Sequence, residues 1–162
     1  MIVSMLLGTI LLLAVMSFYG FSLSSFASMT NYADLNNQSR NASDMLSRDI
    51  RASTSVASAT TNQLVLHASD GTNVSYTYDV VGGSLTRAKG GDSRTVLKGI
   101  STLSFTLYQR PTNSYAAYEQ FPLSKAGTAK LVAFKWTCSR RVAGPVNDSE
   151  TFETAMVQMR NE

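Results

Sequence analysis

The chain has 162 residues, enough for one domain with an appendage but too few for two full cores. Its 14 Lys and Arg against 11 Asp and Glu leave a formal charge of +3, and no basic cluster is denser than Arg140-Arg141, which argues against a nucleic-acid partner. A single histidine and a single cysteine, His67 and Cys138, exclude an internal disulfide, a histidine-rich metal site and a pair of thiolates for zinc.

The first 29 residues differ sharply from the rest. No charged residue precedes Asp34, and residues 1–29 are apolar over most of their length. As a helix this segment would be about 44 Å long, more than the roughly 30 Å hydrocarbon core of a bilayer. It begins apolar and is longer than the core of a cleaved signal peptide, so we expect a retained helix that can span a membrane.

Residues 30–52 are expected to continue the same helix, because neither Gly nor Pro interrupts them. Apolar residues recur at helical spacing and predict one stripe that needs a single packing partner. We therefore expect one helix of roughly 50 residues, about 75 Å long, that is apolar all round in its first half and amphipathic in its second. The residues predicted to pack this second half against the rest of the chain are Tyr32, Leu35, Ala42, Met45, Leu46 and Ile50.

Residues 53–162 are expected to form a β-rich head, because apolar residues alternate with a period of two between turn signals. A connector rich in Ser, Thr and Ala is predicted from Ser53 to Asn62. Strands are expected at 63–68, 73–80, around Leu85, 95–97, 100–110, 132–138 and 155–159, with a proline-containing loop over 111–127. The predicted class is α+β, a long N-terminal helix packed on a C-terminal antiparallel sheet.

This order of elements resembles the type IV pilin superfamily, and local segments carry the resemblance further. Residues 1–10 (MIVSMLLGTI) are similar to the segment that follows the processing motif of prepilins. Residues 35–51 (LNNQSRNASDMLSRDIR) and 155–161 (AMVQMRN) resemble J-type pseudopilins and W-type minor pilins. The resemblance covers the whole chain, closely over residues 1–52 and loosely over the head.

One feature departs from the family pattern. The family has a basic leader, a cleavage-site glycine and a glutamate near the mature N-terminus, whereas here Met5 stands at the fifth place and the first acidic residue is Asp34. Two explanations stay open: the sequence begins a few residues inside the mature protein, or the subunit belongs to the minority without that glutamate. We expect the first, because the segment from Met1 onward matches what normally follows the glutamate.

The resemblance implies a structural subunit of a type IV pilus or a type II secretion pseudopilus, with no enzymatic activity and no cofactor. Such a subunit spans the bacterial inner membrane, is processed by prepilin peptidase, and enters a cell-surface or periplasmic filament of its own copies or other pilins through the assembly machinery. The J- and W-like segments favour a minor subunit, and the resemblance implies that the helix melts locally between Gly8 and Gly20 on assembly into a filament. The residues expected in the filament core or membrane are Leu6, Leu7, Gly8, Ile10, Leu11, Leu12, Leu13, Val15, Met16, Phe18, Tyr19, Gly20 and Phe21.

Two other functional classes compete with this one. A single-pass, membrane-anchored envelope domain that binds a partner without polymerising would have the same composition, and it predicts a monomer in detergent. An enzyme needs converging groups; His67 formally allows a Ser-His-Asp arrangement, but no nucleophile-elbow motif accompanies it. Gly82-Gly83 and Gly90-Gly91 lack the context of a phosphate-binding loop, so we interpret them as turn glycines.

Overall fold

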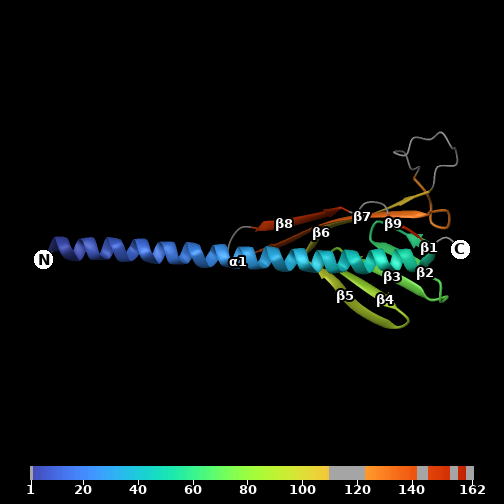
Figure 1. The fold of residues 1–162 in the computed structure, drawn as a ribbon, viewed down its shortest axis with the longest axis horizontal. Coiled ribbons are helices and arrows are strands. Elements are labelled where there is room, and N and C mark those ends of the chain that lie inside the picture. The colour runs from blue at the N-terminus through green and yellow to red at the C-terminus, as the bar shows by residue number, and fades with distance from the viewer. Residues whose placement is uncertain (1, 110–122, 142–145, 154–156, 160–162) are drawn as a thin grey trace.

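A computed structural model describes residues 2–109, 123–141, 146–153 and 157–159. In these residues one helix, α1 (Ile2–Ala52), precedes strands β1 to β9, which confirms the predicted α+β class. The first half of α1 projects alone, and the second half runs between the strands (Figure 1). The molecule is therefore a rod with a head at one end.

The helix is continuous through Gly8 and Gly20 and ends at Ala52. At its end the Ser53 hydroxyl donates a hydrogen bond to the Asp49 carbonyl oxygen at 2.6 Å, which satisfies one of the last free carbonyls. Arg51 lies in the last turn, where a positive charge complements the helix dipole. From Ser53 onward the chain is extended.

Five strands form one antiparallel sheet in the order β1-β2-β3-β4-β5. Their bounds are β1 (Ser53–Ala59), β2 (Gln63–Ala68), β3 (Asn73–Asp79), β4 (Ser84–Lys89) and β5 (Asp92–Lys98). The predicted connector from Ser53 to Asn62 is wrong, since its first seven residues form β1. Their small polar side chains are weak strand formers, but β1 pairs along β2 and places Val56 in the core opposite Leu66, so tertiary pairing outweighs local propensity.

The other strands form a second antiparallel sheet in the order β6-β7-β8, with β9 also paired to β7. Their bounds are β6 (Ile100–Tyr108), β7 (Leu131–Arg141), β8 (Val146–Glu153) and β9 (Val157–Gln158). Strand β8 was not predicted, because its polar sequence VNDSETFE lacks apolar alternation. Most of the predicted loop over 111–127, and residues 155–156 of the predicted last strand, lie outside the described residues.

The chain crosses from the first sheet to the second at Gly99. Gly99 has a φ of 77°, and a Cβ there would lie 3.0 Å from the carbonyl oxygen of Ser139. Gly83 has a φ of 58°, and a Cβ there would lie 3.0 Å from the carbonyl oxygen of Ile100. Only glycine combines a positive φ with such close backbone approach, so these two residues fix the corner between the sheets.

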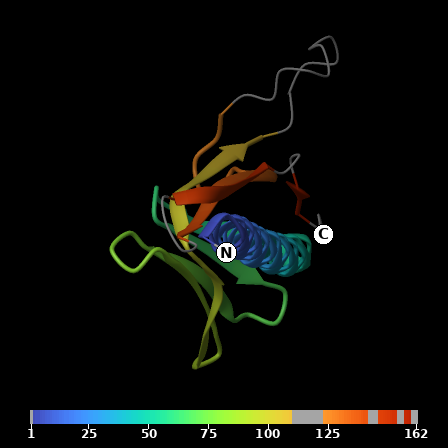
Figure 2. The ribbon, with the colours of Figure 1, turned by 90° about the vertical axis from the view of Figure 1, so that its left-hand side faces the viewer.

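The second half of α1 lies between the two sheets, as the view along the helix shows (Figure 2). Phe134 and Trp136 of β7 and Phe152 of β8 form an aromatic stack with ring centroids 5.0 to 6.2 Å apart. Burying each large side chain contributes about 1.5–3 kcal/mol. Buried residues of α1 and of both sheets form one hydrophobic cluster, so the head and this half of the helix share one core. Its fully buried large residues include Leu35, Leu46, Ile50, Val56, Leu64, Leu66, Tyr76, Leu85, Leu97, Phe134, Trp136 and Met159.

Candidate functional site

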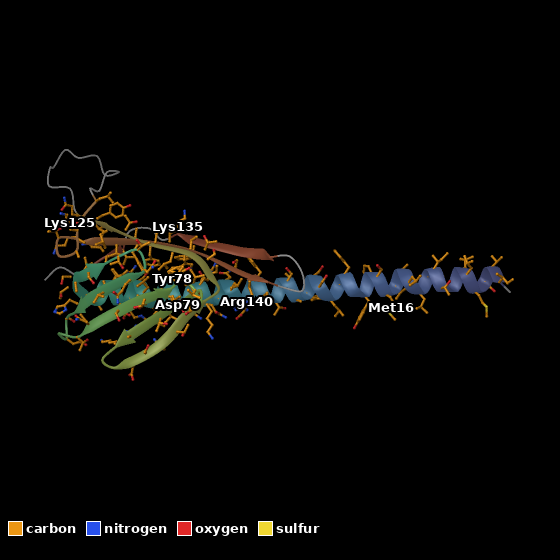
Figure 3. The ribbon with its side chains drawn as sticks, turned by 180° about the vertical axis from the view of Figure 1, so that it is seen from behind. Met16, Tyr78, Asp79, Lys125, Lys135 and Arg140 are labelled. Carbon is orange, nitrogen blue, oxygen red and sulfur yellow. The ribbon has the colours of Figure 1, made fainter. Side chains whose placement is uncertain are left out.

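Residues 2–29 of α1, called the stem from here on, lie outside the core of the head. Nearly all of them are exposed, and none of the most apolar 18-residue stretch is buried. Side chains project from every side of the stem, as around Met16 (Figure 3). By length and composition this helix is able to cross a membrane.

All thirteen residues predicted for the filament core or membrane lie on the stem. The eleven with large side chains are 57–74% exposed. These are Leu6, Leu7, Ile10, Leu11, Leu12, Leu13, Val15, Met16, Phe18, Tyr19 and Phe21. Gly8 and Gly20 have open space where a side chain would be, and the helix is unbroken at both, so the predicted melting is not present in the isolated chain. An apolar surface that surrounds a helix completely is suited to lipid or to other apolar helices.

The stem changes character along its length. Residues 2–16 contain no aromatic side chain, whereas four aromatic residues follow between Phe18 and Phe26. On one side of the helix, six residues line a shallow hollow of about 250 Å³: Phe18, Phe21, Ser22, Ser25, Phe26 and Met29. Phe26 and Met29 were not singled out from the sequence, although both fall in the apolar segment. Such hollows between side-chain ridges receive the side chains of a neighbouring helix.

The second half of α1 presents a buried stripe to the head. Leu35, Ala42, Leu46 and Ile50 are buried as predicted, and Met45 is half-buried with its sulfur 3.1 Å from Arg94 Nη2. The prediction for Tyr32 is wrong, because its side chain is 48% exposed. Tyr32 lies on the same face of α1 as the buried stripe, but one turn before Leu35, the first buried residue. Helical periodicity therefore predicted the face of the helix but not the position at which the head begins to cover it.

Two buried serines complete the stripe and were missed by the search for apolar residues. Ser39 is fully buried, and its hydroxyl oxygen accepts a hydrogen bond from Trp136 Nε1 at 2.7 Å. Ser43 is buried one turn further on. A small hydroxyl at position 39 leaves room for the indole and satisfies its donor, which a larger apolar residue would not do. The available signal was the spacing of four between Leu35 and Ser39.

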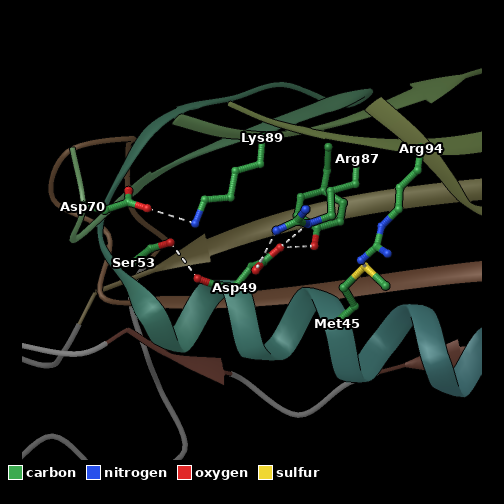
Figure 4. A network of polar contacts seen from close by, with 8 residues as sticks. Met45, Asp49, Ser53, Asp70, Arg87, Lys89 and Arg94 are labelled. Atoms are coloured by element: carbon green, nitrogen blue, oxygen red, sulfur yellow. Dashed lines mark hydrogen bonds and ion pairs between the residues drawn. The ribbon is translucent and has the colours of Figure 1, made fainter. Parts of the chain in front are cut away.

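A polar network ties the helix to the first sheet (Figure 4). Arg87 donates from Nε to Asp49 Oδ2 at 2.6 Å and from Nη2 to Oδ1 at 3.1 Å, and the Tyr76 hydroxyl donates to Oδ2 at 2.5 Å. Burial, followed by the hydrogen bond to Asp49 and the charge of Asp49, raises the pKa of Tyr76. The hydrogen bond to Asp49 raises the pKa of Arg87. A two-pronged pair of this kind fixes rotation of the helix against the sheet.

A second contact holds the helix where the stem leaves the head. Arg140 of β7 donates from Nη1 to Asp34 Oδ2 at 2.8 Å and to Asn31 Oδ1 at 3.1 Å. The hydrogen bond from Arg140, and then that from Gln38, lower the pKa of the Asp34 carboxyl. Polar contacts therefore join α1 to the head at both ends of its packed half, and the buried stripe between them keeps the head in one orientation relative to the stem.

Compared with models of protein families, with curated proteins and with solved structures, the chain has no match. Its function has therefore to be inferred from the stem, the head and the contacts between them.

Proposed function

We propose that this chain is a structural subunit of a type IV pilus or of a type II secretion pseudopilus, and that it assembles through α1. The observation that carries the proposal is the stem: 28 uncharged, mostly apolar residues, exposed on all sides, in one continuous helix with the half that packs into the head. Soluble monomers rarely expose apolar patches larger than a few hundred Å², so the stem requires a cover.

Lipid covers one part of the stem well. Along the bilayer normal, about 20 helical residues fill the roughly 30 Å hydrocarbon core, whereas residues 2–29 extend about 42 Å. If the span begins near Ile2, then Leu23, Phe26 and Met29 lie beyond it with exposed side chains. A bundle of stems buries the helix over its whole length, which favours a filament over a plain membrane anchor.

The rigid join between stem and head supports the same function. The contacts of Asp34 with Arg140 and of Asp49 with Arg87 hold the packed half of α1 at its two ends. Repeating subunits meet their neighbours through the same surfaces each time, which requires each head to keep a fixed position on its stem. In this proposal the subunit binds no cofactor and catalyses no reaction, and its stem lies in the inner membrane until assembly.

The test is to shear filaments from producing cells, image them, and quantify this chain by mass spectrometry, including its N-terminal peptide. A chain that dominates uniform filaments is a major subunit, and a chain present in traces is a minor or priming subunit; either result supports the proposal. If no filament contains the chain and it stays in the inner membrane as a detergent-soluble monomer, the proposal fails. The anchored envelope domain then takes its place.

A further inference from the structure

Among the described residues, five strands lie at the edges of the two sheets. One of them, β9, has only two residues, and three of the other four have features that hinder pairing with another chain. Strand β1 has two register shifts against β2, and β5 has one against β4 together with Asp92, Arg94 and Lys98. Strand β8 has a register shift against β7 near Arg140, and three of its eight residues are acidic. Bulges and charges of this kind protect exposed edges.

Strand β6 has none of these protections along most of its length. Residues 102–108 (TLSFTLY) pair one for one with β7, and they include no charged residue, proline or glycine. The Ser124 N–H donates to the Leu107 carbonyl oxygen at 2.9 Å from the side of β6 that faces away from β7. Because the backbone groups of every second residue of a strand point to the same side, those of Leu103 and Phe105 also point away from β7. Among the described residues, no strand pairs with this outer side over 103–106.

A groove of about 540 Å³ follows this free edge. One wall is β6 from Ser104 to Leu107, the other is the end of β1 and its turn from Ala59 to Thr61, and Leu123 and Ser124 lie at the rim. If a whole sheet of a partner protein approached β6, its edge would collide with the wall formed by β1. The segment after Leu123 connects both walls, since the Ser124 N–H donates to the Leu107 carbonyl oxygen of β6 and the Gly127 N–H donates to the Val56 carbonyl oxygen of β1 at 3.0 Å, so one extended chain is able to reach both.

We propose that this groove binds an extended, uncharged segment of a partner protein, which adds to β6 as a further strand. The free backbone groups of β6 are matched only by an extended backbone. None of the described residues that line the groove is charged. Phe105 and Leu107 lie on one face of β6, and Ser104 and Thr106 on the other, so the partner segment alternates apolar and hydroxyl side chains.

The probe is a dye-labelled peptide of seven alternating Val and Thr residues with one lysine at each end, added to the full chain in detergent micelles. We expect saturable binding by fluorescence polarisation and slower hydrogen exchange at the Phe105 amide. A matched peptide, N-methylated at the residues whose N–H would face β6, keeps the side chains but loses the backbone bonds. We expect it to bind at least tenfold more weakly.

Two lysine substitutions test the location. Thr106→Lys places a charge in the groove and is expected to weaken binding at least tenfold, whereas Thr95→Lys places the same charge on the protected edge β5 and is expected to change nothing. No binding, equal binding of the N-methylated peptide, or equal loss with both variants overturns the proposal. A dimer of the chain that Thr106→Lys abolishes also overturns it, because the occupant is then a second copy. If Thr106→Lys does not fold, hydrogen exchange at the Phe105 amide of the unchanged protein, measured with and without the peptide, decides whether the peptide binds along β6.

Discussion

The two halves of α1 belong to one unbroken helix and yet have opposite surroundings. Residues 2–29 are exposed almost throughout, although they are the most apolar part of the chain. Residues 35–50 contain charged side chains, and the apolar residues Leu35, Ala42, Leu46 and Ile50 among them are buried between two sheets. Within the described residues, the packed half of α1 finds its partner surface in the head, whereas the apolar side chains of the stem stay exposed.

The difference is one of pattern as much as of composition. In the packed half the buried positions Leu35, Ser39, Ala42, Leu46 and Ile50 recur every three or four residues, which makes one stripe. In the stem, apolar residues occupy every face. A stripe needs one partner surface and a uniformly apolar helix needs to be surrounded, so the same helix is built for two environments.

The largest effect is expected from a charge in the stem. Leu12→Lys should abolish filaments and reduce the membrane-bound fraction, because a lysine at the centre of a spanning helix costs about 2.5–3.5 kcal/mol on insertion. Filament yield and membrane fractionation measure the effect, and Leu12→Met is the control. The unfolding midpoint of the head in detergent should not change, since Leu12 lies outside the core. Filaments at the normal yield would contradict the assignment of the stem.

A matched pair of truncations separates the two halves directly. Leu46→Ala should lower the free energy of unfolding by about 2–5 kcal/mol, because Leu46 is fully buried and its truncation leaves a cavity. Leu12→Ala removes the same atoms from an exposed position and should leave that free energy unchanged. Chemical denaturation of the full chain in detergent measures both. Equal effects would mean that the stem takes part in the folded core.

Much of the fold was predictable because its signals are local. The long helix follows from the absence of breakers between Phe21 and Ala52, and β2 matches its prediction over 63–68 because Leu64 and Leu66 alternate with exposed or half-buried positions. Strand β1 was not predictable from its own residues, since Ser and Ala are poor strand formers and its pairing with β2 stabilises it. Strand β8 was missed because its polar sequence lacks apolar alternation, and it too depends on pairing with a neighbour, β7.

The candidate site divides in the same way. The stem was identified as a membrane-competent helix from composition alone, since an uncharged segment of that length is visible in any sequence, whereas its expected place in a filament core came from the family resemblance. Ser39 was not identified, because its burial depends on Trp136, which lies 97 residues away and whose Nε1 donates to it. Asp49 and Arg87 are 38 residues apart in the sequence, and the residues around each of them do not indicate that the two side chains pair. The groove beside β6 depends on sheet order and therefore required the structure.

A smaller effect is expected at the contact between helix and first sheet. Asp49→Ala leaves Arg87 and Tyr76 without their shared acceptor in a mostly buried place, and should lower the free energy of unfolding by about 2 kcal/mol. Asp34→Ala breaks the exposed pair with Arg140 and should leave stability unchanged within error. Urea unfolding at pH 7 measures both variants. An equal loss in the two would show that the exposed contact matters as much as the buried one.

The smallest effect is a change in pH dependence at Tyr76. Burial and Asp49 raise the pKa of Tyr76 above its ordinary value of about 10, so the neutral phenol is favoured in the folded state. This stabilisation is complete below pH 10 and is lost as the pH rises further, because the unfolded state releases the proton first. Tyr76→Phe removes the hydrogen bond to Asp49 and should cost about 1 kcal/mol at pH 7.

Above pH 10 the two proteins should converge, since only the unchanged chain loses stability through this group. Urea unfolding from pH 7 to pH 11, with both proteins in the same detergent, follows the difference between them, and titration of the other residues is common to both. A difference that stays constant to pH 11 would mean that Tyr76 ionises equally well in the folded and unfolded states. That result would contradict the raised pKa of Tyr76, and with it the argument that burial and Asp49 favour the neutral phenol in the folded state.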